Sequence, residues 1–136
     1  MESNARYESR INRVIMKTFN IGREFSGDPA GRYRSDGGFN GERFREDVLR
    51  PLISQLKDNE KLILVIDDDV ESYGSSFLTE VFGGMVKYGY ITKLSLLDKV
   101  EFSFTDPDYE FYKNKAIQYI NEAKFNSVQY IATKGP

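Results

Sequence analysis

The sequence has no cysteine and no histidine, and each absence excludes a kind of chemistry. Without cysteine, disulfide bonds and thiolate-ligated metal centres cannot form. Without histidine, a Ser-His-Asp triad and a His-ligated zinc site are excluded as well. An enzyme built on this chain would have to use carboxylates, lysine or tyrosine for proton transfer.

Long apolar runs and a strong net charge are also missing. The longest apolar run, LILVI at 62–66, is far shorter than the ~20 residues that cross a bilayer. The polar start of the chain, MESNARYESR, contains no apolar signal core. A net charge of −2 creates no global field that would attract nucleic acid or an anionic membrane. We therefore expect a cytoplasmic protein of one domain, with neither a membrane nor a nucleic acid as its partner.

Strand-like and helix-like segments alternate along the chain. Runs of β-branched and aromatic residues predict strands, and these runs fall at 13–19, 22–25, 61–67, 91–97 and 100–105. Helical spacing, N-cap residues and prolines predict helices, which cover about 41–56, 75–88 and 107–124. Pro51 should kink or restart the first helix. This order of elements favours an α/β sheet covered by helices.

Two details of the pattern predict how the elements pack. The continuous apolar run at 62–66 is typical of a central strand that is buried on both faces. Gly83 and Gly84 lower the helix propensity of the second helix by ~1 kcal/mol each relative to alanine. We expect them to be compensated by a close approach of that helix to the sheet.

The segment DDDVESYGSSF, residues 67–77, lies between the apolar strand and the second helix. Its simplest interpretation is a polar joint, in which the aspartates end the strand in water and Gly74 makes the turn. Ser75 or Ser76 would then cap the helix, because serine is among the preferred N-cap residues.

An enzymatic interpretation of the same segment takes Asp67 and Asp69 as a D-x-D pair. Residues two apart on a strand share a side, and aspartate-nucleophile phosphatases use this spacing for a nucleophile and an acid. However, Glu71 stands where that family has threonine or valine. A lone D-x-D pair is also weak evidence.

A third interpretation comes from a resemblance. The strand ILVID followed by DVESYGSSFLTEVFGGMV resembles the core of the STAS domain, the fold of bacterial anti-sigma-factor antagonists and of the cytoplasmic domains of sulfate transporters. The upstream block PAGRYRSDGGFNGERFREDVLRPL, 29–52, resembles a divergent STAS-like group of unknown function. The resemblance implies an α/β fold with a mixed sheet of four to five strands and three main helices largely on one face. It places this domain at 13–125, after a loose segment 1–12 and before a tail or edge strand at 126–136.

The resemblance also assigns candidate site residues. Antagonists carry an Asp-Ser-Ser-Gly-Leu run at a helix start, and a partner kinase phosphorylates one of its serines. Ser75 matches the phosphorylated serine and Ser76 the second one, whereas Gly74 and Phe77 depart from the motif. The surrounding residues are then expected to contact the partner, and these are Asp68, Asp69, Glu71, Tyr73 and Gly74.

The loop GRYRSDGGFNGERFRE concentrates arginines around glycines before a helix. Backbone amides and guanidinium groups could form an anion site there, with Arg32, Arg34 and Arg43 as candidates. The simpler interpretation is a glycine-rich connection whose solvated arginines pair with neighbouring carboxylates, namely Glu42, Glu46 and Asp47.

Together these features predict a non-enzymatic protein-interaction module without a cofactor. Its expected partner is an ATPase-type kinase or an anti-sigma-like protein, which phosphorylation of Ser75 or Ser76 would release. The first alternative is a sensor of a small anion or nucleotide that uses the loop 29–45. The second alternative is a carboxylate-based phosphohydrolase.

Overall fold

A computed structural model describes residues 13–136, and its strands form one parallel sheet. The strands are β1 (Ile15–Asn20), β2 (Glu60–Val65) and β3 (Val100–Ser103), in the order β1-β2-β3. In the register, Leu64 of β2 lies beside Phe19 on one side and Phe102 on the other. The α/β class is confirmed. The described residues hold three strands, so the expected mixed sheet of four to five strands is not confirmed, and segment 1–12 lies outside the described residues.

Helical segments follow each strand. Between β1 and β2 lie α2 (Ile21–Glu24), η1 (Arg34–Asp36), α3 (Gly41–Phe44), the π-helical η2 (Arg45–Leu49) and α4 (Arg50–Ser54). Between β2 and β3 lie α5 (Ser75–Leu78), the π-helical η3 (Thr79–Gly83), α6 (Gly84–Lys87) and α7 (Lys93–Lys99). The chain continues through η4 (Pro107–Tyr109) and α8 (Glu110–Glu122). The predicted helix starts at Gly41, Ser75 and Pro107 are confirmed, and Pro51 lies in the first turn of α4, directly after a π segment.

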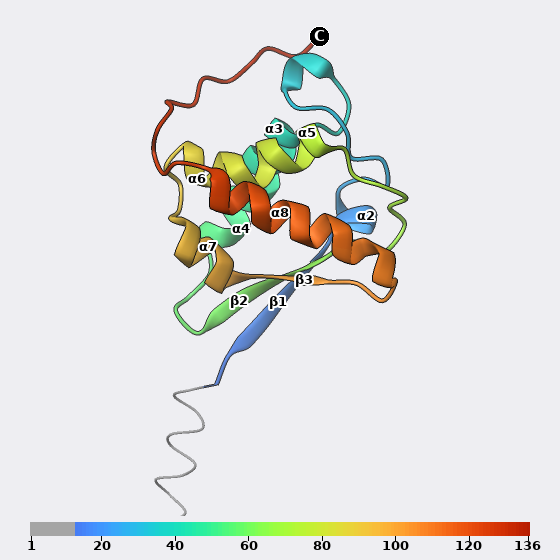
Figure 1. Ribbon diagram of the computed structural model, residues 1–136, viewed down its shortest axis with the longest axis vertical. Helices are drawn as coiled ribbons and strands as arrows, with labels where there is room; N and C mark the ends of the chain where they lie inside the picture. The colour runs from blue at the N-terminus through green and yellow to red at the C-terminus, as the bar shows by residue number, and fades with distance from the viewer. Residues whose placement is uncertain (1–12) are drawn as a thin grey trace, which may run out of the picture.

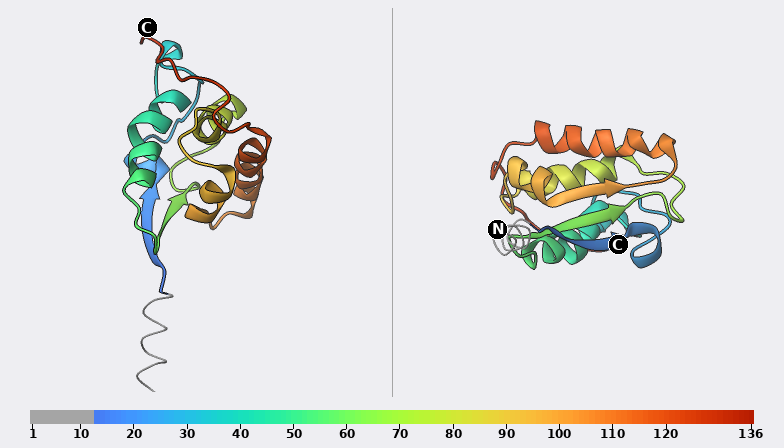
Figure 2. Two further views of the ribbon diagram at one scale, coloured as in Figure 1. Left: turned by 90° about the vertical axis from the view of Figure 1, so that its left-hand side faces the viewer. Right: turned by 90° about the horizontal axis from the view of Figure 1, so that it is seen from below.

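The helices gather on one side of the sheet, as Figure 1 and the view from below in Figure 2 show. Leu62, Leu64 and Ile66 point to that side and are buried. Ile63 and Val65 point to the opposite side and are only half-buried. The expectation that β2 is buried on both faces is therefore wrong, because one face of the sheet carries no helix among the described residues.

Two predicted strands are helical in the structure. At 22–25 the chain forms α2, because the Asn20 side chain accepts a hydrogen bond from the Arg23 amide at 3.1 Å and starts a helical turn. At 91–97 it forms α7, whose N-cap is Thr92. Residues 93–99, KLSLLDK, contain good helix formers and no β-branched residue, so the cap and propensity outweigh the apolar pattern.

The close approach expected at Gly83 and Gly84 exists, but the neighbour is not the sheet. A Cβ atom on Gly83 would lie 3.5 Å from the carbonyl oxygen of Tyr119 in α8. A Cβ atom on Gly84 would lie 2.7 Å from Nη1 of Arg45. The Arg45 side chain, which comes from η2, therefore occupies the space that a side chain at position 84 would need.

The segment 126–136 forms a tail that pairs with no strand of the described residues, and it is anchored rather than loose. The amides of Asn126 and Ser127 each donate to a carbonyl of the helix end, Val86 and Lys87, at 3.0 Å. Further along, the Thr133 amide donates to Glu42 of α3 at 3.0 Å. Figure 1 shows this tail running over the helices to the carboxyl terminus.

Candidate partner-binding site at the carboxyl ends of the strands

Asp67 joins the ends of two strands. Its Oδ2 accepts hydrogen bonds from the Thr105 amide at 2.6 Å, the Thr105 hydroxyl at 3.1 Å and the Asp106 amide at 2.9 Å. Burial raises the pKa of Asp67, but these donors outweigh it and leave the pKa below its ordinary value. The carboxylate therefore holds the segment after β3 against the end of β2.

Asp68 makes the corresponding connection on the other side of β2. Its Oδ2 accepts from the Asn20 side chain at 2.8 Å and from Nε of Arg23 at 2.6 Å. The hydrogen bond from Arg23 is the main reason that the pKa of Asp68 is lowered. Asp68 is thus occupied within the chain, which weakens the expectation that it contacts a partner.

Asp69 does not share a site with Asp67. Its carboxylate is exposed and lies 3.8 Å from Arg23, on the β1 side, whereas the Asp67 carboxylate faces the segment after β3. The backbone of Asp69 has a φ of 60°, so the chain turns there and the strand alternation no longer holds. The D-x-D pair is therefore not brought together. Within residues 13–136, no cluster of carboxylates is arranged to hold a metal ion.

Two tyrosines fix the backbone between the aspartates and the helix. The buried Tyr73 donates its hydroxyl to the carbonyl of Ile66 at 2.8 Å. The Tyr109 hydroxyl donates to the carbonyls of Val70 and Glu71, the latter at 3.0 Å. The expectation that Tyr73 contacts a partner is wrong, because its ring and hydroxyl anchor the loop. The role of Tyr109 was not visible in the sequence, since its partner is a backbone carbonyl 39 residues away.

Ser75 is exposed at the start of the continuous helical segment 75–87, and Gly74 is its N-cap. Ser76 is half-buried. The expected difference in exposure between the two serines is confirmed. The expected capping role of Ser76 is wrong, because no side chain of the described residues caps this first turn. The first amides of the helix are therefore available to a ligand or to water.

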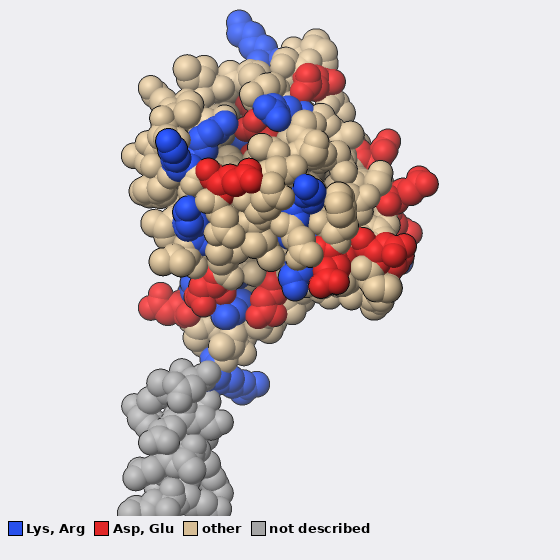
Figure 3. Space-filling model, in the orientation of Figure 1, with Lys and Arg blue, Asp and Glu red and all other residues tan. Residues whose placement is uncertain are grey.

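The surface at the carboxyl ends of β2 and β3 is acidic. Exposed carboxylates follow the ends of β2 and β3, and they belong to Asp69, Glu71, Asp106, Asp108 and Glu110. Figure 3 shows acidic side chains gathered on the lower right of the molecule, where these segments lie in Figure 1. The segment that leads to Ser75 begins at this acidic surface, and Asp69 and Glu71 are its members nearest to Ser75 in the sequence.

The candidate arginines of the loop 29–45 do not converge on an anion site. Both terminal nitrogens of Arg34 donate to the carboxylate of Asp47, at 3.1 and 2.8 Å. The Arg43 guanidinium donates to the Gly38 carbonyl and lies 4.5 Å from the centre of the Phe39 ring. Arg32 lies over the ring of Tyr33. The interpretation that the arginines pair with neighbouring carboxylates is confirmed for Arg34.

Arg45 takes part in a buried network that sequence reasoning missed. Its side chain is 0% exposed, and it donates to the Glu80 carboxylate, to the Glu80 carbonyl at 2.8 Å and to Glu46 at 2.8 Å. The guanidinium lies 4.6 and 4.9 Å from the ring centres of Tyr88 and Tyr130. Burial lowers the pKa of Arg45, but its carboxylate partners outweigh burial and raise it. A signal was present in the sequence, because Glu80 interrupts the apolar stripe of the second helix.

Glu42 is a further buried charge, linked to Arg45 through Tyr130, and it holds the carboxyl-terminal tail. Its carboxylate is 1% exposed and accepts hydrogen bonds from the hydroxyls of Tyr130 and Thr133 and from the amides of Arg34 and Thr133. Burial raises the pKa of Glu42, but the hydrogen bonds from these donors outweigh burial and lower the pKa from 4.5 to about 2. The tail therefore contributes Tyr130 and Thr133 to the buried polar network.

The parallel sheet, the helices on one of its faces and the serine-bearing helix start define an α/β domain that is consistent with a STAS-like fold. The comparison with protein families agrees with this class. A family described as "STAS-like domain of unknown function (DUF4325)" matches residues 40–109, slightly more than half of the chain, and the chain belongs to this family. Neither curated proteins nor solved structures give a match. In the described residues, no helix has the length and apolar character to span a membrane.

Proposed function

We propose that this STAS-like domain is a non-enzymatic interaction module and that Ser75 is both a partner contact and a phosphorylation switch. The exposed position of Ser75 at the start of the helical segment 75–87 is the observation that carries the proposal. The resemblance to the anti-sigma-factor antagonists supports it, because their phosphorylated serine stands at the matching position. The partner is an ATPase-type kinase or an anti-sigma-like protein of the cytoplasm, which holds the ATP and magnesium.

The rigidity of the loop supports recognition at Ser75. Tyr73 donates to the carbonyl of Ile66, and Tyr109 donates to the carbonyls of Val70 and Glu71. These hydrogen bonds hold the segment 66–71, so Ser75 has a fixed position before a partner binds. A preformed contact binds with less loss of conformational entropy than a mobile one. This geometry suits a small hydroxyl that fits closely against another protein.

Phosphorylation would change this contact through charge. A phosphate adds about −1.5 to −2 charges, and the uncapped amides of the first helical turn favour an anion at that point. The phosphoserine would therefore be tolerated by the fold. It would also increase the negative charge near Asp69 and Glu71 in the sequence, so a partner surface that carries carboxylates would be repelled.

The test is a pull-down from the native host with the Ser75→Ala and Ser75→Glu variants. Ser72 is an exposed serine of the same loop, so Ser72→Ala and Ser72→Glu are matched controls. We expect Ser75→Ala to retain the partner, Ser75→Glu to lose it, and both Ser72 variants to behave like the unmodified protein. Mass spectrometry of the protein from its host should detect phosphate on Ser75. Equal capture by Ser75→Ala and Ser75→Glu would contradict the switch.

A further inference from the structure

The outer edge of β1 is a row of hydrogen-bonding groups that face away from the sheet. The Ile15 amide donates to the Asn59 carbonyl at 2.8 Å, so residues 15, 17 and 19 direct their backbone groups toward β2. Alternation then directs the N–H and C=O groups of Met16 and Thr18 outward. The row ends at Asn20, whose amide donates to Glu24 at 2.7 Å. Among the described residues, no strand pairs with this edge.

The same edge has neither a proline nor a bulge, and Lys17 is the one charged side chain within β1. Native edge strands are commonly blocked by proline, by a bulge or by charged side chains. Here three consecutive large apolar residues are exposed, with 48% of Val14, 42% of Ile15 and 37% of Met16 accessible. An open edge with exposed apolar side chains can pair with an added strand.

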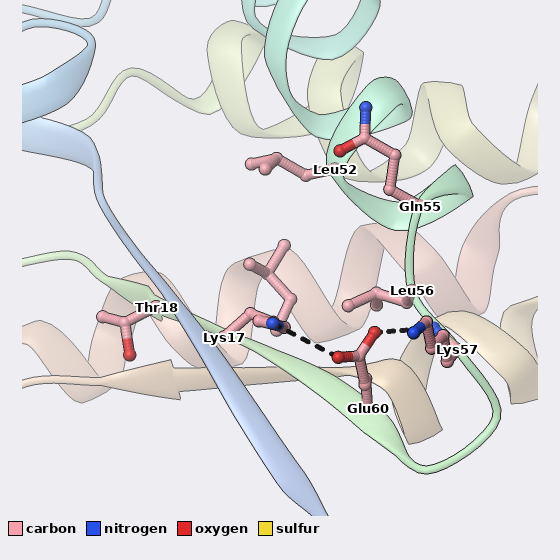
Figure 4. A pocket seen from close by; sticks show the side chains of 8 residues that line it. Lys17, Thr18, Leu52, Gln55, Leu56, Lys57 and Glu60 are labelled. Atoms are coloured by element: carbon pink, nitrogen blue, oxygen red, sulfur yellow. Dashed lines mark hydrogen bonds and ion pairs between the residues drawn. The ribbon is translucent and has the colours of Figure 1, made fainter.

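A cleft runs alongside this edge on the helix side of the sheet, and Figure 4 shows it between the strands and the end of α4. Its volume is about 450 Å³. Leu52, Leu56 and Leu62 supply its apolar lining. Side chains of a strand added to β1 alternate between the two faces of the sheet, so every second side chain would enter this cleft.

The exposed charge of the cleft is positive. Glu60 is nearly buried, and its carboxylate accepts from the Lys57 amide at 2.9 Å and pairs with Lys17 at 3.3 Å. The Lys17 side chain remains 58% exposed, and Lys57 is exposed as well. A carboxylate entering the cleft would therefore meet ammonium groups, whereas a second cation would be repelled.

We propose that the β1 edge and this cleft form a docking groove for an extended segment of another protein, which adds as a strand and places apolar side chains and one carboxylate into the cleft. The carboxylate pairs with Lys17, and the apolar side chains lie against Leu52 and Leu56. The groove lies along the outer edge of β1 and Ser75 lies beyond the carboxyl end of β2, so this docking does not depend on the proposed switch.

The first test measures hydrogen exchange of the Met16 and Thr18 amides by NMR in the full chain. The probe is an acetylated and amidated octapeptide, Thr-Val-Thr-Glu-Thr-Val-Thr-Val, and the matched control replaces its glutamate with lysine. We expect both amides to exchange fast in the free protein and to become protected as the glutamate peptide saturates. The lysine peptide should bind at least about fivefold more weakly, which corresponds to one exposed ion pair.

The second test uses Thr18→Pro, which removes one outward N–H group and leaves the hydrogen bonds to β2 unchanged. Thr18→Val keeps that N–H group and is the control. The glutamate peptide should lose about fivefold in affinity with Thr18→Pro, since one hydrogen bond contributes ~1 kcal/mol, and little with Thr18→Val. Lys17→Met should remove the preference between the two peptides, and this variant tests the groove even if Thr18→Pro does not fold.

Three results would overturn the proposal. One is equal binding of the glutamate and lysine peptides, and another is unchanged affinity in a folded Thr18→Pro variant. The third is protection of the Met16 and Thr18 amides without any peptide. Protection at every protein concentration would mean that the same chain occupies the edge, and protection that rises with concentration would mean that a second copy does.

Discussion

The two charge-dense segments of this protein, 29–45 and 67–77, use their charges in opposite ways. In 67–77 the charges of Asp67 and Asp68 are satisfied at the surface by donors from the neighbouring strand ends. In 29–45 the decisive charges, Glu42 and Arg45, are buried completely and paired with residues from distant parts of the chain. Two charges of the arginine-rich segment are thus buried, whereas the aspartate-rich segment holds the ends of the strands together and leads to an exposed serine.

This difference shows how burial decides the role of a charge. A surface ion pair contributes between about 0 and 1 kcal/mol, so the pairs of Asp68 and Asp69 with Arg23 stabilise the fold only weakly. A buried charge that loses its partner destabilises the fold by about 3–5 kcal/mol. The four predictions below test the comparison, beginning with the largest effect.

Substitution of Arg45 should have the largest effect on stability. Arg45→Ala leaves the carboxylates of Glu80 and Glu46 without their buried partner and opens a gap between two tyrosine rings. We expect a loss of about 3–5 kcal/mol in the free energy of unfolding, measured with urea. Arg43→Ala is the control in the same helix turn and should cost less than about 1 kcal/mol. Similar losses for the two variants would contradict the contrast between a buried and a surface charge.

The stability of the protein should fall in acid through Glu42. Its pKa is lowered from 4.5 to about 2 in the folded state, so the ionised form stabilises the fold above about pH 4.5. That stabilisation is lost as the pH falls from 4.5 toward 2, and it amounts to about 3 kcal/mol. Urea unfolding at pH 7, 4 and 3 measures the loss. Glu42→Gln should be less stable than the wild type at pH 7, and the difference should shrink in acid. A constant difference would argue against Glu42 as the titrating group.

Asp67 and Asp69 should differ although they look alike in the sequence. Asp67→Asn weakens three hydrogen bonds at the strand ends and should cost about 1–3 kcal/mol. Asp69→Asn should change stability by less than about 0.5 kcal/mol, because the side chain is exposed and asparagine also accepts a positive φ. Thermal melts of both variants at neutral pH compare them directly. If Asp69→Asn destabilised the protein more than Asp67→Asn, the conclusion that Asp67 joins the ends of β2 and β3 would be wrong.

Ser76 should give the smallest effect. An N-cap serine contributes ~1 kcal/mol, but Ser76 lies inside the helix and caps nothing among the described residues. We therefore expect Ser76→Ala to change the unfolding free energy by less than about 0.5 kcal/mol. Asn40→Ala is the comparison, because the Asn40 side chain accepts from the Arg43 amide at 2.8 Å and caps α3. Equal losses for the two variants would restore Ser76 as a cap.

Local sequence signals predicted the central helices well. Asn40 caps α3, and the helices begin at Gly41, Ser75 and Pro107, because caps and apolar spacing are local properties. The same signals failed at 91–97, where Thr92 caps a helix. There the apolar pattern of a short run fits a strand as well as a helix.

The candidate site was predicted in part. The exposed Ser75 follows from its place at a helix start, which the sequence shows. The anchoring roles of Tyr73 and Tyr109 do not follow, because each depends on a carbonyl that the folded backbone brings within reach. The arginine candidates failed for a similar reason, since only the packing of α3 shows that Arg34 faces Asp47.

The sequence by itself determined the α/β class, the apolar central strand, the helix starts and the STAS-like motif around Ser75, because these depend on neighbouring residues. The tertiary structure decided which charges are buried, which aspartates join the strands and which sheet edge stays open. Those outcomes depend on contacts between residues far apart in the chain, such as Arg45 with Glu80 and Glu42 with Thr133. The free energy of a charge is set by burial and by its partner, and both exist only after the elements have packed.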